Sequence, residues 1–258
     1  MKYTVLTLFP EITDAFFSTS IMAKAVKRGI IEYRAINIRD YATDKHKTCD
    51  DAPYGGGPGM LMLPEPLDLA IKAALSGEAS AAGKPRIIYL SPSGQPFSQE
   101  LARKLAAERE LILICGRYEG IDQRIIDRYV DEEISVGDYV LSSGEVAALA
   151  IIDATYRLVD NVICADSLTE ESFSSGLLEY PQFTRPEVFD TIKVPEVLLS
   201  GHHEQIRLWR LEKRVEKTLR QRPDLIRHGK ELGIFTCEIN SIIDRLQTDI
   251  EGEKNERN

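Results

Sequence analysis

The chain has 258 residues, of which 43% are hydrophobic and 28% charged, and its formal net charge is −9. This balance is typical of a soluble globular protein with one large or two modest domains, and it excludes fibrous and low-complexity chains. No apolar run approaches the roughly 18 residues that a membrane-spanning helix needs, so we expect no membrane association.

Strands and helices alternate in the predictions for the first 160 residues. Short apolar runs predict strands at 3–9, 31–38, 86–90 and 111–115. The last of them, LILIC, is typical of a strand buried on both faces of a parallel sheet. Amphipathic patterns predict helices at 11–28, 65–75, 98–108, 122–129 and 144–159, with Ser98 as an N-cap. This order indicates an α/β fold with a mostly parallel sheet.

The composition changes after residue 160. Residues 161–176 are rich in Ser, Thr, Asp, Glu and Gly, which predicts a flexible connection. We therefore expect one domain at 1–160, a flexible linker at 161–176 and a small all-helical C-terminal domain at 177–258. Helical sequence should end near Leu246, before a frayed charged tail at 249–258.

Cysteines and histidines give no metal-site pattern. The four cysteines lie dozens of residues apart, at Cys49, Cys115, Cys164 and Cys237. This spacing fits neither a disulfide framework nor a zinc site, so we expect free thiols and no metal ligands. The N-terminus lacks the cleavage site of a signal peptide, and we expect a cytoplasmic protein.

A glycine-rich segment at 50–60, DDAPYGGGPGM, is the most unusual stretch of the chain. Its glycines and prolines cannot continue a helix or a strand, and they shape a loop that a ligand can approach closely. No Gly-Lys-Ser/Thr follows, so it is not a P-loop, and its spacing is not that of a dinucleotide fingerprint. A plain surface turn is the alternative.

Three further segments are placed where α/β proteins bind ligands, past the carboxyl ends of strands. They are 89–94 (YLSPSG), 115–122 (CGRYEGID) and 135–145 (SVGDYVLSSGE). Each combines small residues with a few polar groups, as a pocket for a flat heterocycle and a ribose requires. Any one of them could equally be an ordinary strand-end loop.

Together with residues 176–186 (GLLEYPQFTRP), these motifs resemble, in order and spacing, the bacterial tRNA (guanine-N1-)-methyltransferase family. The resemblance runs from Phe9 to about Arg214. It implies methyl transfer from S-adenosylmethionine to N1 of guanosine 37, beside the tRNA anticodon. It also implies a SPOUT fold with a deep trefoil knot, a homodimer with composite active sites, and a possible Mg²⁺ requirement; no DNA partner is implied.

The resemblance assigns residues to two binding sites. For the S-adenosylmethionine pocket it implies Tyr89, Leu90, Ser91, Gly116, Tyr118, Glu119, Val136, Gly137, Asp138, Tyr139, Val140, Leu141 and Gly144. For the guanine it implies His46, Asp50, Tyr54, Gly55 and Gly59.

The resemblance also implies the catalytic pair. Guanine N1 carries a proton, so a carboxylate general base is needed, and an arginine can stabilise the charge that develops on O6. Arg157 matches the family arginine, although spacing alone would make it a solvated helix residue. Glu171 stands where the family pattern has an aspartate, and Glu170 is the neighbouring alternative. Ser143 stands where a glycine is common.

A basic helix is expected in the C-terminal part. Residues 201–230 contain nine Lys/Arg and four Asp/Glu, a local charge of +5 within an acidic chain. Such asymmetry is typical of a nucleic-acid contact. We expect Arg207, Arg210 and Arg214 to contact tRNA phosphates, although a solvated helix face would show the same pattern.

Two other classes of protein remain as alternatives. A nucleotide-dependent oxidoreductase would show a Gly-x-Gly-x-x-Gly turn after its first strand, but this strand leads into Phe9-Pro10-Glu11. A non-catalytic RNA-binding protein would bind tRNA without methyl transfer, and it would leave the cofactor motifs unexplained.

Overall fold

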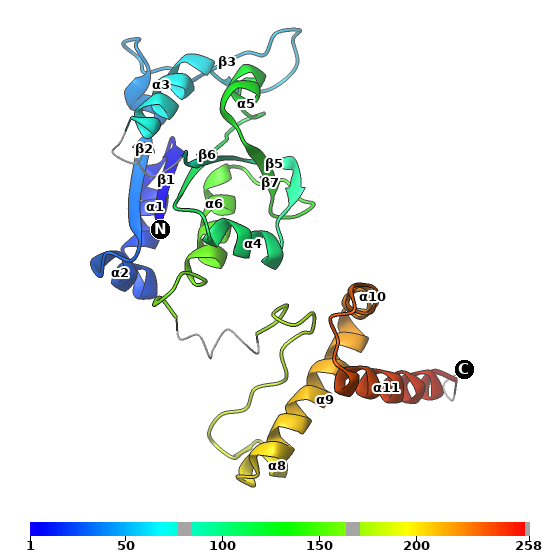
Figure 1. The fold of residues 1–258 in the computed structure, drawn as a ribbon. Helices are drawn as coiled ribbons and strands as arrows, with labels where there is room; N and C mark the ends of the chain where they lie inside the picture. The colour runs from blue at the N-terminus through cyan, green and yellow to red at the C-terminus, as the bar shows by residue number, and fades with distance from the viewer. Residues whose placement is uncertain (77–83, 164–170, 256–258) are drawn as a thin grey trace. The chain divides into compact units, whose positions relative to one another are not determined.

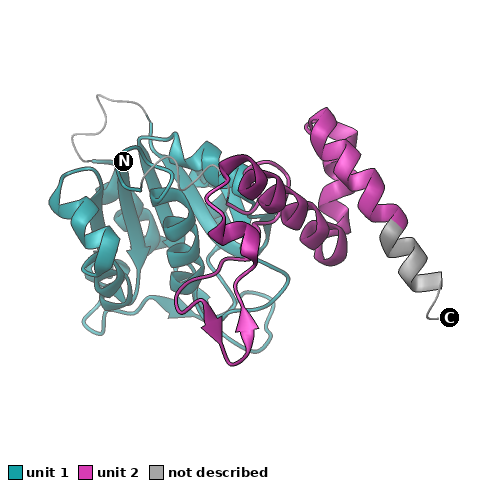
Figure 2. Ribbon diagram, turned by 90° about the horizontal axis from the view of Figure 1, so that it is seen from below, with its two compact units in different colours: residues 1–164 teal, residues 165–258 magenta. Residues whose placement is uncertain are grey.

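The computed structural model describes residues 1–76, 84–163 and 171–255. The chain divides into two compact units, residues 1–164 and 165–258 (Figure 2). Each unit has a hydrophobic core of its own.

Unit 1 is built on a five-stranded sheet (Figure 1). Its strands, in the spatial order β2-β1-β6-β5-β7, are Glu32–Asn37, Lys2–Thr7, Glu110–Cys115, Arg86–Pro96 and Glu132–Ser135. All four neighbouring pairs are parallel. The predicted α/β fold with a mostly parallel sheet is therefore confirmed.

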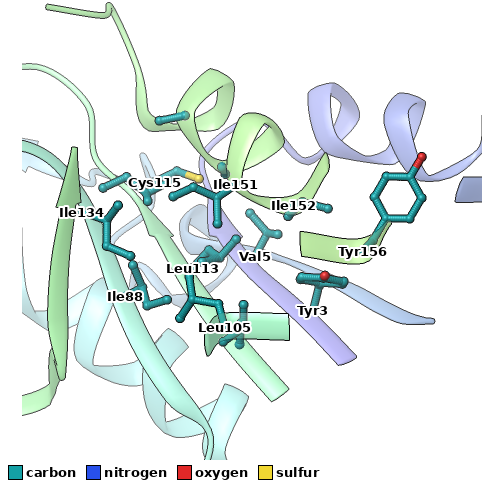
Figure 3. Close-up of a cluster of buried hydrophobic side chains, with 14 of the residues drawn as sticks. Tyr3, Val5, Ile88, Leu105, Leu113, Cys115, Ile134, Ile151, Ile152 and Tyr156 are labelled. Atoms are coloured by element: carbon teal, nitrogen blue, oxygen red, sulfur yellow. The ribbon is translucent and has the colours of Figure 1, made fainter. Parts of the chain in front are cut away.

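Side chains of the central strand β6 alternate between two cores, because successive residues of a strand point to opposite faces. Leu111, Leu113 and Cys115 belong to one core, which Figure 3 shows together with side chains from β1 and α6. Ile112 and Ile114 belong to the core on the other face. The apolar run LILIC reflects this burial on both sides.

Helices contribute to the cores of both faces. The first core includes residues of α1 (Pro10–Phe17), α2 (Ser20–Lys27), α4 (Gln99–Ala106) and α6 (Gly144–Tyr156). The second includes residues of η1 (Ile38–Tyr41), α3 (Pro64–Leu75) and α5 (Gln123–Tyr129). Ser98 caps α4 as expected, since its hydroxyl accepts a hydrogen bond from Leu101 N.

Three elements of the structure differ from the sequence prediction. The helix expected at 11–28 is two helices, α1 and α2, separated around Thr19, which has an extended backbone. Strand β7 was not predicted, because its sequence EEIS offers one large apolar side chain. Strand β5 extends to Pro96, with a register shift between Leu90 and Gln95 in its pairing with β7.

Helix α6 is tied to β1 by a buried hydrogen bond. Thr7 Oγ1 at the end of β1 donates to Glu145 Oε1 at 2.6 Å, and both residues are fully buried. Phe9 N donates to the same hydroxyl at 2.9 Å. The first turn of α6 is thereby fixed beside the carboxyl end of the sheet.

Thr7→Val is expected to lower the free energy of unfolding by about 1–3 kcal/mol, because it leaves a buried carboxylate with no donor. Urea unfolding measures the loss. Thr19→Val is the control, because Thr19 is exposed and its hydroxyl donates a hydrogen bond to Ala15 O. Equal stability of the two variants would show that the Thr7 bond does not anchor α6.

Unit 2 contains four helices among its described residues: α8 (Glu196–Leu199), α9 (His203–Gln221), α10 (Pro223–Leu232) and α11 (Cys237–Asn255). Leu177, Val215, Ile226, Phe235 and Ile243 form its core. The ring of Phe235 occupies the space that a Cβ at Gly229 would fill, so α10 and the segment before α11 approach closely.

Two expectations for the C-terminal part are wrong. It is not all-helical, because β8 (Val188–Phe189) and β9 (Ile192–Lys193) pair as an antiparallel hairpin. Its turn residues Asp190 and Thr191 have positive φ without a glycine to signal it. The helix expected to end near Leu246 continues to Asn255 as part of α11.

Part of the predicted linker is an ordered turn of unit 2. Ser174 N and Oγ both donate to Glu171 O, and Phe173 N donates to Leu177 O. Of the rest of that prediction, residues 161–163 belong to unit 1, and residues 164–170 lie outside the described residues. Cys49, Cys115 and Cys237 are free, as expected, and Cys164 is likewise outside the described residues.

Candidate active site

A cavity of about 260 Å³ lies at the carboxyl ends of β6 and β7, beside the register shift of β5. Its wall includes twelve of the thirteen residues expected to bind the cofactor; Asp138 is not among them. The described strand ends thus bring together three loops that are far apart in the sequence. This is the edge at which open α/β sheets bind ligands.

The register shift in β5 shapes one side of the cavity. Residues 91–94 interrupt the pairing of β5 with β7, and Ser91 and Pro92 line the cavity. Gly94 lies so close to β7 that a Cβ there would stand 2.4 Å from Ile134 N. A glycine is therefore required where the segment returns to the sheet.

Two glycines join β6 to the start of α6. Gly144 N donates to Gly116 O at 2.9 Å, and a Cβ at Gly144 would lie 2.8 Å from Cys115 Cα. Ser143, which precedes α6, has an extended φ of −164° and pairs with Arg117 as an isolated bridge. Since any residue adopts that φ, a glycine is not needed at position 143.

The glycine-rich loop is joined to the cavity by backbone hydrogen bonds. Short strands β3 (Asp50–Asp51) and β4 (Leu61–Met62) close its base. Glu119 N donates to Met60 O, and Met62 N donates to Gly120 O, each at 3.0 Å. The Glu119 side chain fills the space that a Cβ at Gly59 would need.

The tip of this loop is open. A Cβ at Gly55, Gly56 or Gly57 would meet no atom within 4 Å, and all three glycines have positive φ. Tyr54 is fully exposed. His46 is also exposed, on a turn where its backbone N donates to Asp44 Oδ2. The loop tip therefore offers accessible backbone, while the base of the loop lies next to the cavity wall.

An electrostatic interaction between the Asp50 carboxylate and the Tyr118 hydroxyl links the loop to the cavity. Burial raises the pKa of Tyr118, the Asp50 carboxylate raises it further, and Arg39 opposes the shift. Asp50→Asn should lower the pKa of Tyr118 towards its ordinary value, because a neighbouring negative charge disfavours the phenolate. Ultraviolet titration, with Tyr118→Phe subtracted, measures this change; an unaltered pKa would contradict the contact.

The two expected catalytic residues belong to different units. Arg157 follows the last turn of α6 in unit 1 and is partly buried. Glu171 begins the turn of unit 2 described above and is also partly buried. Glu170 lies outside the described residues. The catalytic pairing of Arg157 and Glu171 therefore stays a prediction.

The arginines expected to contact phosphate lie in three settings on α9. Arg207 is exposed, and its guanidinium binds both Glu204 and Glu238. The Arg210 guanidinium lies 4.8 Å from the centre of the Tyr180 ring. Arg214 is buried and donates to Ser175 Oγ and Leu178 O, so it holds the turn that carries Glu171.

Sequence reasoning missed cavity residues that have no matching role in the resemblance. Arg117 is the most notable, because it is a cation in the cavity wall. Its position two residues after the end of β6 was the available signal. Pro92, Gly120 and Ile134 also line the cavity.

Fold and site together define an α/β enzyme with a ligand cavity at the carboxyl ends of parallel strands. The family model described as "tRNA (Guanine-1)-methyltransferase TrmD" matches residues 1–228. The chain belongs to this family and is a methyltransferase.

Curated relatives agree over nearly their full length. A "tRNA (guanine-N(1)-)-methyltransferase" of Treponema denticola is 60% identical over 96% of this chain and 100% of the relative. Proteins of the same name from Treponema pallidum and Borreliella burgdorferi are 56% and 58% identical. The match to the Treponema pallidum protein covers 97% of this chain and 98% of the relative. The match to the Borreliella burgdorferi protein covers 87% of this chain and 92% of the relative.

No helix among the described residues is long and apolar enough to cross a membrane.

Proposed function

We propose that this chain transfers the methyl group of S-adenosylmethionine to N1 of guanosine 37 in tRNA. The observation that carries the proposal is the cavity, because a methyltransferase needs a donor site and the expected donor-binding residues meet around it. The family membership and the names of the relatives support guanine N1 and tRNA as the substrate. Position 37 rests on the resemblance of the motifs.

The cavity wall suits a bent S-adenosylmethionine. It combines apolar side chains such as Leu90 and Leu141 with glycine backbone at 116, 137 and 144. Ligand sites are commonly lined in this way, with a few polar groups that fix orientation. The positive sulfonium makes transfer an in-line displacement, for which positioning matters more than covalent assistance.

The guanine would approach at the glycine-rich loop. The open backbone at Gly55 is accessible to a splayed-out base, and Asp50 and Gly59 connect this loop to the cavity through Tyr118 and Glu119. His46 and Tyr54 are exposed nearby in the sequence. A base in this place would have its ring edge near the donor cavity.

Glu171 would remove the proton from guanine N1, and Arg157 would stabilise the charge on O6. Glu171 is longer than the family aspartate by one methylene. A misplacement of about 1 Å can cost on the order of 100-fold in rate, so the position of its turn matters. The hydrogen bonds of residues 171–177 support a defined conformation of that turn within unit 2.

We further propose a SPOUT fold with a trefoil knot and a homodimer with composite active sites. The exposed apolar side chains of Tyr139, Val140 and Val146 support an interface beside the donor cavity. The Mg²⁺ requirement that the resemblance implies stays a prediction. Among the described residues, no three His, Cys, Asp or Glu side chains are grouped to hold a metal ion.

tRNA phosphates would contact the exposed side of α9. Arg207 and Arg210 are the proposed contacts, although Arg207 would first have to exchange its two carboxylate partners for phosphate. We do not extend this role to Arg214, because its side chain is buried. Phosphate contacts position a substrate without reading its sequence.

The test is incubation of the purified chain with labelled S-adenosylmethionine and unmodified tRNA, followed by nucleoside digestion. We expect label in 1-methylguanosine. Label in another nucleoside would contradict the assignment of guanine N1, and tRNA binding without transfer would favour the non-catalytic alternative.

A further inference from the structure

Arg117 is a cavity residue to which neither the motifs nor the relatives assign a role. It follows Gly116 at the end of β6 and lines the cavity. Its guanidinium carbon lies 4.3 Å from the centre of the Phe9 ring, at the end of β1. This cation–π contact holds the side chain against the sheet edge and satisfies none of its N–H donors.

The guanidinium of Arg117 has no anionic partner among the described residues. Its Nε is buried and has no hydrogen-bond acceptor. Arg86, Arg124 and Arg222, in contrast, each form an ion pair with a carboxylate. A buried charged donor without an acceptor is costly, so the site favours a ligand that supplies one.

The surroundings also favour a negatively charged group. Helix α6 begins at Gly144 in the cavity wall, and the positive end of its dipole adds to the charge of Arg117. The Glu145 carboxylate in the first turn opposes this effect, but it is fully buried and bonded to Thr7. The Glu119 carboxylate, the other charged side chain of the wall, also opposes it, but this residue is exposed and solvent screens its charge.

We propose that Arg117 binds the α-carboxylate of S-adenosylmethionine, an inference that rests on the proposed function. The sulfonium and the ammonium of this ligand are both cations, so its carboxylate is the one group that a guanidinium attracts. An arginine guanidinium can bind a carboxylate through two parallel hydrogen bonds. Arg117 is thus a specificity residue, which selects a donor that carries an intact amino-acid group.

The experiment compares two ligands that differ by the carboxylate alone: S-adenosylmethionine and its decarboxylated form. Calorimetry measures the affinity of each for the full-length wild type, Arg117→Met and Arg117→Lys. We expect Arg117→Met to weaken S-adenosylmethionine binding by about 10- to 100-fold and to leave the decarboxylated ligand within about twofold. Arg117→Lys should lose less, because it keeps the charge.

Arg103→Met is the matched control, because Arg103 is exposed on α4 and is not part of the cavity wall. It should bind both ligands as the wild type does. Unchanged binding of the decarboxylated ligand to Arg117→Met also shows that the cavity is still folded.

Three results would overturn the proposal. Equal losses for both ligands would mean that Arg117 only supports the fold, and no loss for either would mean that it does not bind the ligand. Weaker tRNA binding with unchanged S-adenosylmethionine binding would assign Arg117 to a phosphate. Failure of the wild type to bind S-adenosylmethionine would instead contradict the proposed function itself.

Discussion

Glu171→Gln is expected to slow single-turnover methyl transfer by about 100- to 10,000-fold, the usual contribution of a general base. Glutamine has nearly the same shape and cannot accept the guanine N1 proton. The backbone hydrogen bonds of the Glu171 turn do not involve the carboxylate, so the turn should persist. Binding of tRNA and donor should change little. Rapid-quench transfer of labelled methyl groups measures the rate.

Two variants control this experiment. Glu171→Asp restores the carboxylate of the family pattern and should stay within about 100-fold of the wild type, the cost of a displacement of about 1 Å. Glu187→Gln, on an exposed residue of the same unit, should transfer at the wild-type rate. A near-normal rate for Glu171→Gln would remove Glu171 from the mechanism and make Glu170 the next base to test.

Gly144→Ala is expected to weaken S-adenosylmethionine binding by about 10-fold or more and to lower the free energy of unfolding by about 1–3 kcal/mol. The added methyl would stand 2.8 Å from both Cys115 Cα and Gly116 N. These are backbone atoms and cannot swing aside. The start of α6 would have to move away from β6, and the cavity wall would move with it.

Gly29→Ala separates stability from binding. Gly29 has a positive φ of +69°, so an alanine there is strained, but its Cβ would meet no atom within 4 Å. It lies outside the cavity wall. Thermal unfolding and calorimetry should therefore show a destabilised variant with unchanged donor affinity. Equal donor affinity in Gly144→Ala would contradict the close packing of α6 on β6.

The strands buried on both faces were predictable, because an uninterrupted apolar run is a strong local signal. LILIC at 111–115 predicted β6 correctly. Strand β7 was missed because EEIS has the composition of an exposed segment. Its backbone pairing with β5, which is distant in the sequence, makes it a strand. The β8–β9 turn was missed because Asp190 and Thr191 adopt positive φ without the usual glycine.

The site was predictable where the backbone itself forms it. Gly116 and Gly144 are required because neighbouring atoms lie too close for a Cβ, and both belong to motifs that can be recognised in the sequence. Long side chains were harder to place. The sequence pattern predicts a solvated Arg214, but its guanidinium donates a hydrogen bond to Ser175 Oγ. The guanidinium of Arg117, in the cavity wall, lies over the Phe9 ring. These contacts depend on elements that are far apart in the chain.

The most direct test of the central claim compares two tRNA transcripts that differ at position 37 alone. One carries guanosine there and the other adenosine, and both are incubated with the purified chain and labelled S-adenosylmethionine. The account predicts stoichiometric labelling of the first, recovered as 1-methylguanosine, and none of the second. Equal labelling of both transcripts, or no labelling of either while the donor is bound, would contradict it.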